Sequence, residues 1–251
     1  PSTAPPGAWQ APVTLLLIAI AAAAALPAPY SYDIGAVAAT LATISAPAAF
    51  GLPWWSPLLI GSAVALGYAV AAVTAFDPRA AYARATVAAV VVLHFVGAGL
   101  VRPWSTALAL TAVVLIGLLA ATMARADLVA TPAAVGGPDE PMVVVPRDES
   151  GMPRHRVLIG GAATAGVLLA VPGVFAAVAA DQGHDAQVVL TAALAASSIC
   201  LAVLCLTARW IPQYLPWATA GLVGGATITA LASVPSQFPT AMYAAAAALL
   251  G

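Results

Sequence analysis

The sequence predicts an all-α fold, a polytopic bundle of transmembrane helices. Hydrophobic residues make up 63% of the 251 residues and charged residues only 7%, whereas about a quarter of the residues of a soluble domain are charged. Many apolar runs approach the roughly 20 residues that a helix needs to cross a bilayer. Charges cluster in a single polar interruption, residues 124–156, which divides a first half (1–123) from a second (157–251).

Prolines and polar turns divide the first half into five predicted helices. The first ends at Pro27, because proline lacks the amide that would continue a helix. Asp33 is placed to cap the second helix, and Pro47 predicts a kink within it. Polar turns at 77–79 and 102–103 bound the fourth helix. The predicted helices cover residues 13–26, 34–50, 56–75, 82–101 and 104–123.

The second half contains three further complete helices and the start of a fourth. Pro172-Gly173 is predicted to break the sixth helix, and the polar turn 181–185 follows it. We expect the chain to be part of a longer polypeptide, because it begins at Pro1 and its last apolar run is too short to span. The predicted helices cover residues 157–180, 186–208 and 213–234, and a partial ninth begins at Phe238, which makes eight complete spans.

The aromatic residues support these boundaries. All six tryptophans, and every tyrosine except Tyr68, fall at or next to predicted helix ends. Membrane proteins concentrate Trp and Tyr at the two water interfaces. Tyr68 alone lies inside a predicted span.

The arginines predict an orientation. Seven of them fall in turns on one side of the predicted bundle, and only Arg102 falls on the other. Positively charged loops face the cytoplasm. The pattern therefore predicts a multi-pass protein of the bacterial plasma membrane, with the polar loop 124–156 in the cytoplasm and the amino terminus outside.

The two halves resemble each other weakly. Leu52-Pro53-Trp54 matches Leu215-Pro216-Trp217, and with a short gap Phe76 and Tyr82 match Phe238 and Tyr243. If helices one to four recur as six to nine, the repeating unit has five helices, and an odd number of crossings inverts the second copy. Chance similarity between two alanine-rich halves is the alternative to this five-plus-five inverted repeat.

Four residues are candidates for substrate binding. His94 lies in the middle of a predicted span, where an ionisable group is costly and often functional, although a histidine bonded to a neighbouring helix would also explain it. Arg102 either reaches up to lipid head groups or binds an anionic substrate or lipid. Pro172 and Gly173 mark either a kink or a broken-helix substrate site.

The remaining patterns predict neither a cofactor nor a metal site. Asp181, His184 and Asp185 resemble a loose metal constellation, but polar residues belong in an exposed turn. Asp77 fits a turn better than catalysis. Cys200 and Cys205 diverge by about 140° on a helix, so no disulfide follows. No zinc-binding, phosphate-loop or nucleophile motif is present.

Three functional hypotheses remain, with the lipid bilayer as the expected partner in each. The first is a transporter-like protein that moves or binds a small or lipid-like solute. The second is a non-catalytic membrane subunit of a larger secretion or cell-envelope assembly, with membrane protein partners. The third is a lipid-linked glycosyltransferase. A net charge of −1 without a basic patch argues against nucleic-acid binding.

Overall fold

The computed structural model describes residues 9–27, 30–125 and 153–232, and every regular element in this part is a helix. The predicted ninth helix from Phe238 and most of the polar loop, including Arg147, lie outside the described residues. The helices are α1 (Gln10–Ala25), α2 (Tyr30–Ala49), α3 (Ser56–Val73), α4 (Pro78–Gly99), α5 (Pro103–Arg125), α6 (Arg154–Asp181), α7 (Ala186–Thr207) and α8 (Leu215–Ala232). Two single-turn 3-10 helices, η1 (Ala208–Trp210) and η2 (Pro212–Tyr214), join α7 to α8.

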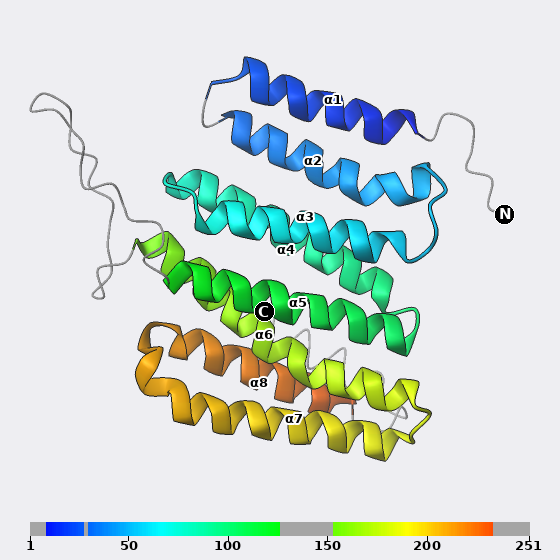
Figure 1. Cartoon of the computed structure of the whole chain (residues 1–251), viewed down its shortest axis with the longest axis vertical. Coiled ribbons are helices and arrows are strands. Elements are labelled where there is room, and N and C mark those ends of the chain that lie inside the picture. Colours follow the sequence, from blue (N-terminus) through cyan, green and yellow to red (C-terminus); the bar gives the residue numbers. More distant parts are fainter. Residues whose placement is uncertain (1–8, 28–29, 126–152, 233–251) are drawn as a thin grey trace, which may run out of the picture.

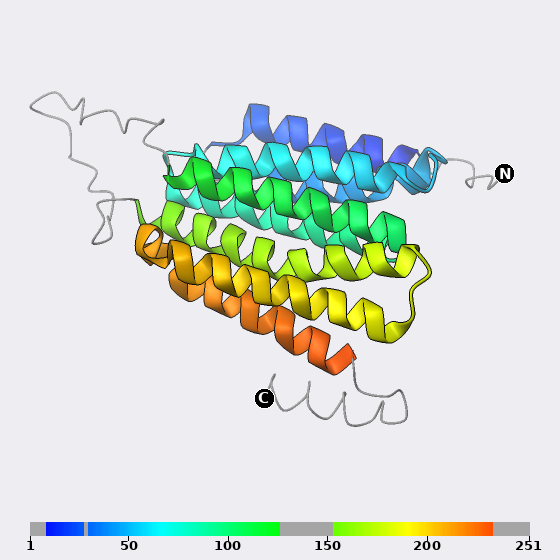
Figure 2. The ribbon, with the colours of Figure 1, turned by 60° about the horizontal axis from the view of Figure 1, so that its bottom comes forward.

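The helices are stacked side by side in a row rather than closed into a ring (Figure 1). The α1–α2 hairpin forms one end of the row, α3 with α4 and α5 with α6 form the middle, and α7 with α8 form the other end (Figures 1 and 2). Each helix packs mainly on its neighbours in this order, and α1 packs mainly on α2.

Five of the described helices, α3 to α7, are long and apolar enough to cross a membrane. The predicted multi-pass fold is therefore confirmed at this level. Of the eight predicted crossings, α1 (16 residues) and the apolar part of α2 are shorter. Long apolar side chains such as Leu93, Leu115 and Leu206 are more than 60% exposed, as expected for a surface solvated by lipid.

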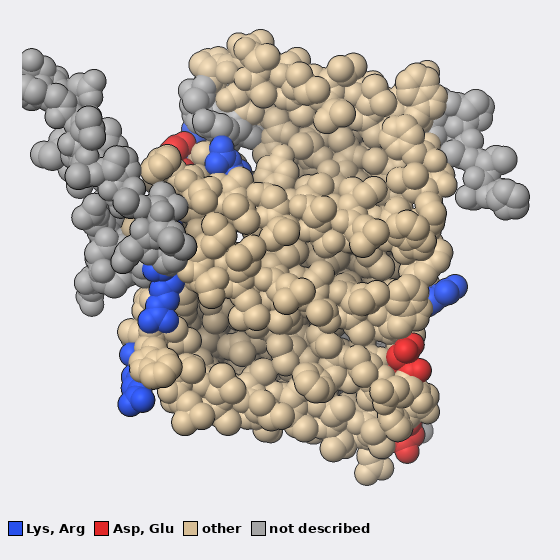
Figure 3. All heavy atoms as spheres, in the orientation of Figure 1, with Lys and Arg blue, Asp and Glu red and all other residues tan. Residues whose placement is uncertain are grey.

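Arginines gather at one end of the helices. Figure 3 shows basic atoms along the end where α3, α5 and α7 finish, with acidic atoms beside them, and both basic and acidic atoms at the opposite end. We call the first of these the arginine-rich end. Which membrane the chain occupies, and which end faces the cytoplasm, stay predictions. The arginines at this end are Arg79, Arg84, Arg125, Arg154, Arg156 and Arg209.

Glycines bring α5, α6 and α8 into close contact. A Cβ added at Gly117 would lie 3.0 Å from the carbonyl oxygen of Ala163 on α6. A Cβ at Gly221 of α8 would lie 2.7 Å from the Cα of Ala165, also on α6. Close approach at small residues increases van der Waals contact, which holds helices together in lipid. These three helices therefore form a tightly packed body.

Two predictions about helix ends are wrong. Asp33 does not cap α2, because that helix begins at Tyr30 and Asp33 lies within it. Pro172 does not break α6, which continues through it to Asp181. Asp77 has the expected turn role, since its carboxylate accepts hydrogen bonds from the amides of Arg79 and Ala80 at 3.2 Å and caps α4.

The inverted repeat stays a prediction. Its alignment pairs Gly61 of α3 with Gly224 of α8. Gly61 packs against Phe95 on α4, whereas Gly224 lies against Leu169 on α6. The alignment equates α6 with α1, and the segment it equates with α4 lies outside the described residues.

Candidate functional site

One cavity of the described chain lies between the α1–α2 hairpin and the α3–α4 pair, near the arginine-rich end. Its volume is about 300 Å³. We call it the Arg84 pocket, after the charged residue among its described lining residues. The lining residues are Ala19, Ile20 and Ala23 of α1, Ser31, Gly35, Ala36 and Ala39 of α2, Tyr68 of α3 and Arg84 of α4.

Helix geometry places Arg84 and Tyr68 together. Arg84 lies in the second turn of α4 and Tyr68 in the last turns of α3, and the two antiparallel helices are joined by a short turn. One terminal nitrogen of Arg84 donates a hydrogen bond of 2.9 Å to the carbonyl oxygen of Ala71 on α3. This bond holds the guanidinium against α3, on the wall that faces the hairpin.

The electrostatics of the Arg84 pocket follow from its composition. Arg84 is close enough to Tyr68 for a Coulombic interaction with its phenol. The alanines, Ile20 and Gly35 on the hairpin side carry no charge. Charges act more strongly where water is scarce. The pocket can therefore hold an anionic group at Arg84 and apolar groups along α1 and α2.

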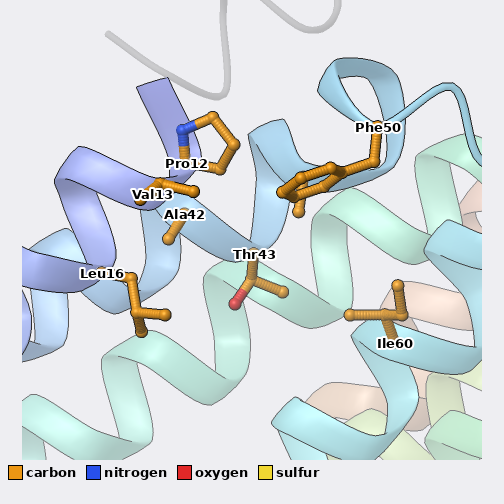
Figure 4. Close-up of a pocket in the computed structure, with 8 residues that line it drawn as sticks. Pro12, Val13, Leu16, Ala42, Thr43, Phe50 and Ile60 are labelled. Carbon is orange, nitrogen blue, oxygen red and sulfur yellow. The ribbon is translucent and has the colours of Figure 1, made fainter. Parts of the chain in front are cut away.

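A second cavity lies between the α1–α2 hairpin and α3 at the opposite end (Figure 4). Its volume is about 230 Å³, and its wall is apolar except for Thr43. We call it the Phe50 pocket. Ala39 lines the Arg84 pocket and Ala42 lines the Phe50 pocket, so less than one turn of α2 separates them. The lining residues are Pro12, Val13, Leu16, Ala42, Thr43, Ala46, Phe50 and Ile60.

At the Arg84 pocket α2 contacts the α3–α4 pair. Ala36 of α2 belongs to one buried cluster with Ala65 of α3 and with Val87 and Val91 of α4. All four are at least 92% buried. Helix α2 is thus held against α3 and α4 beside the Arg84 pocket by alanine and valine side chains.

The four residues predicted to bind substrate are not brought together, and none of them lines either cavity. His94 lies on α4, with its Nε2 buried and without a hydrogen-bond partner among the described residues. Pro172 is buried within α6. A Cβ at Gly173 would lie 2.7 Å from Leu110 Cδ1, so α5 packs directly against that position. A binding role for these residues stays a prediction.

Arg102 lies in an aromatic cluster at the opposite end of the bundle. Its Cζ lies 5.0 Å from the centroid of the Trp54 ring, a cation–π geometry. Trp54 and Trp104 meet edge to face with centroids 5.2 Å apart. Ser105, fully buried, fixes the turn by donating to the carbonyl oxygen of Gly99 at 2.7 Å. The cluster is suited to the boundary between lipid and water, where Trp is enriched.

The sequence reasoning did not identify Arg84 and Tyr68 as a pair. A signal existed for each. Tyr68 is the one tyrosine inside a predicted span, and Arg84 falls just inside the predicted helix 82–101.

Comparisons of the chain with protein-family models, curated proteins and solved structures return no match.

Proposed function

We propose that the chain is a multi-pass membrane transporter that binds a lipid-like solute with one anionic head group and moves it along the interface between the α1–α2 hairpin and α3–α4. The observation that carries this proposal is the Arg84 pocket, an apolar cavity among membrane helices with one guanidinium in its wall. A charged group within a membrane helix is costly and is commonly retained for function.

The head group is the part of the solute that Arg84 recognises. A guanidinium presents a planar set of donors that matches a carboxylate or a phosphate, and bonds to ionised groups are shorter and stronger than neutral ones. The Tyr68 hydroxyl provides a donor on the same wall. A volume of about 300 Å³ lies at the lower limit for ligand pockets. It accommodates a head group and its first carbons, and the chain extends into the bilayer.

The Phe50 pocket supports movement rather than binding alone. The two cavities lie at opposite ends of one side of the hairpin, and less than one turn of α2, from Ala39 to Ala42, separates them. Alanine contacts contribute little buried area, so separating them costs less than separating larger side chains.

Lipid translocation in reconstituted vesicles tests the proposal. Phosphatidylcholine vesicles carrying a trace of fluorescent phosphatidylglycerol are quenched from outside with dithionite, and the rate at which the inner label becomes accessible is measured. We expect the protein to accelerate this rate. Loss of a hydrogen bond to a charged group costs about 1.5–3 kcal/mol, so Arg84→Gln should weaken binding about 10- to 100-fold. Tyr68→Phe should have a smaller effect.

The matched control is Arg79→Gln, which removes an exposed arginine from the first turn of the same helix. It should leave translocation unchanged. The proposal fails if fluorescent phosphatidylcholine moves as fast as phosphatidylglycerol, or if the Arg84 and Arg79 variants behave alike.

One observation favours a non-catalytic membrane subunit as the second candidate. Helix α1 packs mainly on α2, and its long side chains Leu16, Leu17 and Ile20 are more than half exposed. A partner helix would cover this surface. In that case a partner helix would cover α1 in an assembly, and vesicles with the chain alone would show no translocation.

The structure gives no support to the enzyme hypothesis within its described part. The described carboxylates do not converge, because Asp77 and the pair Asp181 and Asp185 lie at opposite ends.

A further inference from the structure

The first turn of α6 concentrates positive charge. Arg154, His155 and Arg156 open the helix in succession, and the turn contains no acidic residue. The N-cap residue, Pro153, forms no side-chain capping bond. A helix N-terminus carries a partial positive charge of its own, so cations there are unfavourable and anions are stabilised. The turn therefore combines two arginines with a helix end that favours a negative group.

Arg156 is buried within this turn. Its side chain is 6% exposed, and its Nε is buried with no hydrogen-bond partner among the described residues. A buried charge without a partner is strongly unfavourable. Buried unsatisfied groups are rare, and an unseen ion is one of their ordinary explanations.

His155 fixes the position of this turn. It is 3% exposed, and its ring Nε2 lies 3.3 Å from the carbonyl oxygen of Ala75, to which the ring N–H donates. The bond ties the start of α6 to the end of α3. The turn is thus part of the packed structure at the arginine-rich end (Figure 3).

We propose that the first turn of α6 is a binding site for a phosphate group, held by Arg156 and the helix N-terminus with Arg154 at its rim. A phosphate brings up to about two negative charges and several acceptor oxygens. Phosphates bind readily at helix N-termini, and the planar guanidinium matches their geometry. The phosphate comes either from a lipid head group or from free phosphate in water. This site is separate from the Arg84 pocket and does not depend on the proposed transport.

Ligand-dependent thermal unfolding of the full chain in a neutral detergent tests the site. The probes are inorganic phosphate, short-chain phosphatidic acid and, as a control, diacylglycerol with the same chains. A ligand that binds only the folded state raises the midpoint of unfolding. We expect both phosphate-bearing probes, or phosphatidic acid alone, to raise it, and diacylglycerol to leave it unchanged. The first result assigns the site to any phosphate, and the second assigns it to a lipid head group.

The variant Arg156→Gln has two expected effects of opposite direction. It should raise the midpoint without ligand, because it removes a buried guanidinium whose Nε has no hydrogen-bond partner among the described residues. It should also weaken phosphate binding about tenfold or more. A residue with a merely structural role would lower the midpoint instead. Arg209→Gln, which removes an exposed arginine at the same end, is the matched control and should change neither quantity.

Arg154→Gln keeps the test decisive if the Arg156 variant does not fold. Arg154 is exposed, so its removal should preserve the fold and weaken phosphate binding severalfold. The proposal is overturned if no phosphate-bearing probe raises the midpoint, or if the foldable variants bind as tightly as the unchanged chain. Arg84→Gln should keep the full response to phosphate, which separates this site from the transport hypothesis.

Discussion

Substitution of Gly221 by alanine should separate α8 from α6. The added Cβ would lie 2.7 Å from the Cα and 2.8 Å from the carbonyl carbon of Ala165, whereas ordinary contact begins at 3.4 Å. These are backbone atoms that no rotamer change can move, so the helices must shift apart by about 0.7 Å, which forfeits part of their dispersion energy. Overpacking of this kind typically costs about 1–3 kcal/mol. Alanine recovers up to about 1 kcal/mol through its helix propensity.

The net expectation is a loss of about 1–2 kcal/mol. For a chain of this length that corresponds to a midpoint lower by roughly 2–8 °C, measured by tryptophan fluorescence during heating in detergent. The control is Gly166→Ala, since a Cβ at Gly166 meets nothing within 4 Å. This control should leave the midpoint unchanged or raise it slightly. Equal shifts for the two variants would refute the reasoning that close α6–α8 packing explains the glycine.

Two further predictions concern accessibility. Cys205 is exposed on α7 and Cys200 is buried, so a membrane-permeant thiol reagent should label Cys205 faster, as measured by mass spectrometry of the digested protein; equal labelling would contradict the packing of α7. In a cysteine-free background, cysteines at His184 and at Arg209 should react with a membrane-impermeant reagent from opposite faces of sealed vesicles. Labelling of both from one face would contradict the separation of the two ends.

Residues that begin or end helices made much of the fold predictable. Helix seven was expected at 186–208 and runs Ala186–Thr207, because Asp185 is a capping residue and indeed accepts a bond from the Val188 amide at 2.9 Å. The prediction that Pro172 breaks the sixth helix was wrong. In lipid no water satisfies the groups that a broken helix would expose, so α6 stays continuous through a buried proline.

The Arg84 pocket was less predictable for a different reason. In a water-soluble helix the apolar stripe shows which face is buried, but here both faces are apolar and alanine occurs on each. The packing of Tyr68 and Arg84 against the hairpin depends on four helices that meet in space. Tyr68 and Arg84 stood out in the sequence by their residue types, whereas the cavity that both of them line did not.

The unequal lengths of α1 and α6 have a consequence for the surrounding bilayer. At about 1.5 Å per residue, the 16 residues of α1 measure about 24 Å and the 28 residues of α6 about 42 Å. A hydrocarbon layer is roughly 30 Å thick. Helix α6 is longer than the hydrocarbon layer is thick, which favours tilt of the helix. Helix α1 is about 6 Å shorter than that thickness, so the bilayer beside it must thin. The flank that bounds both cavities is therefore the one where α1 falls short of the hydrocarbon layer.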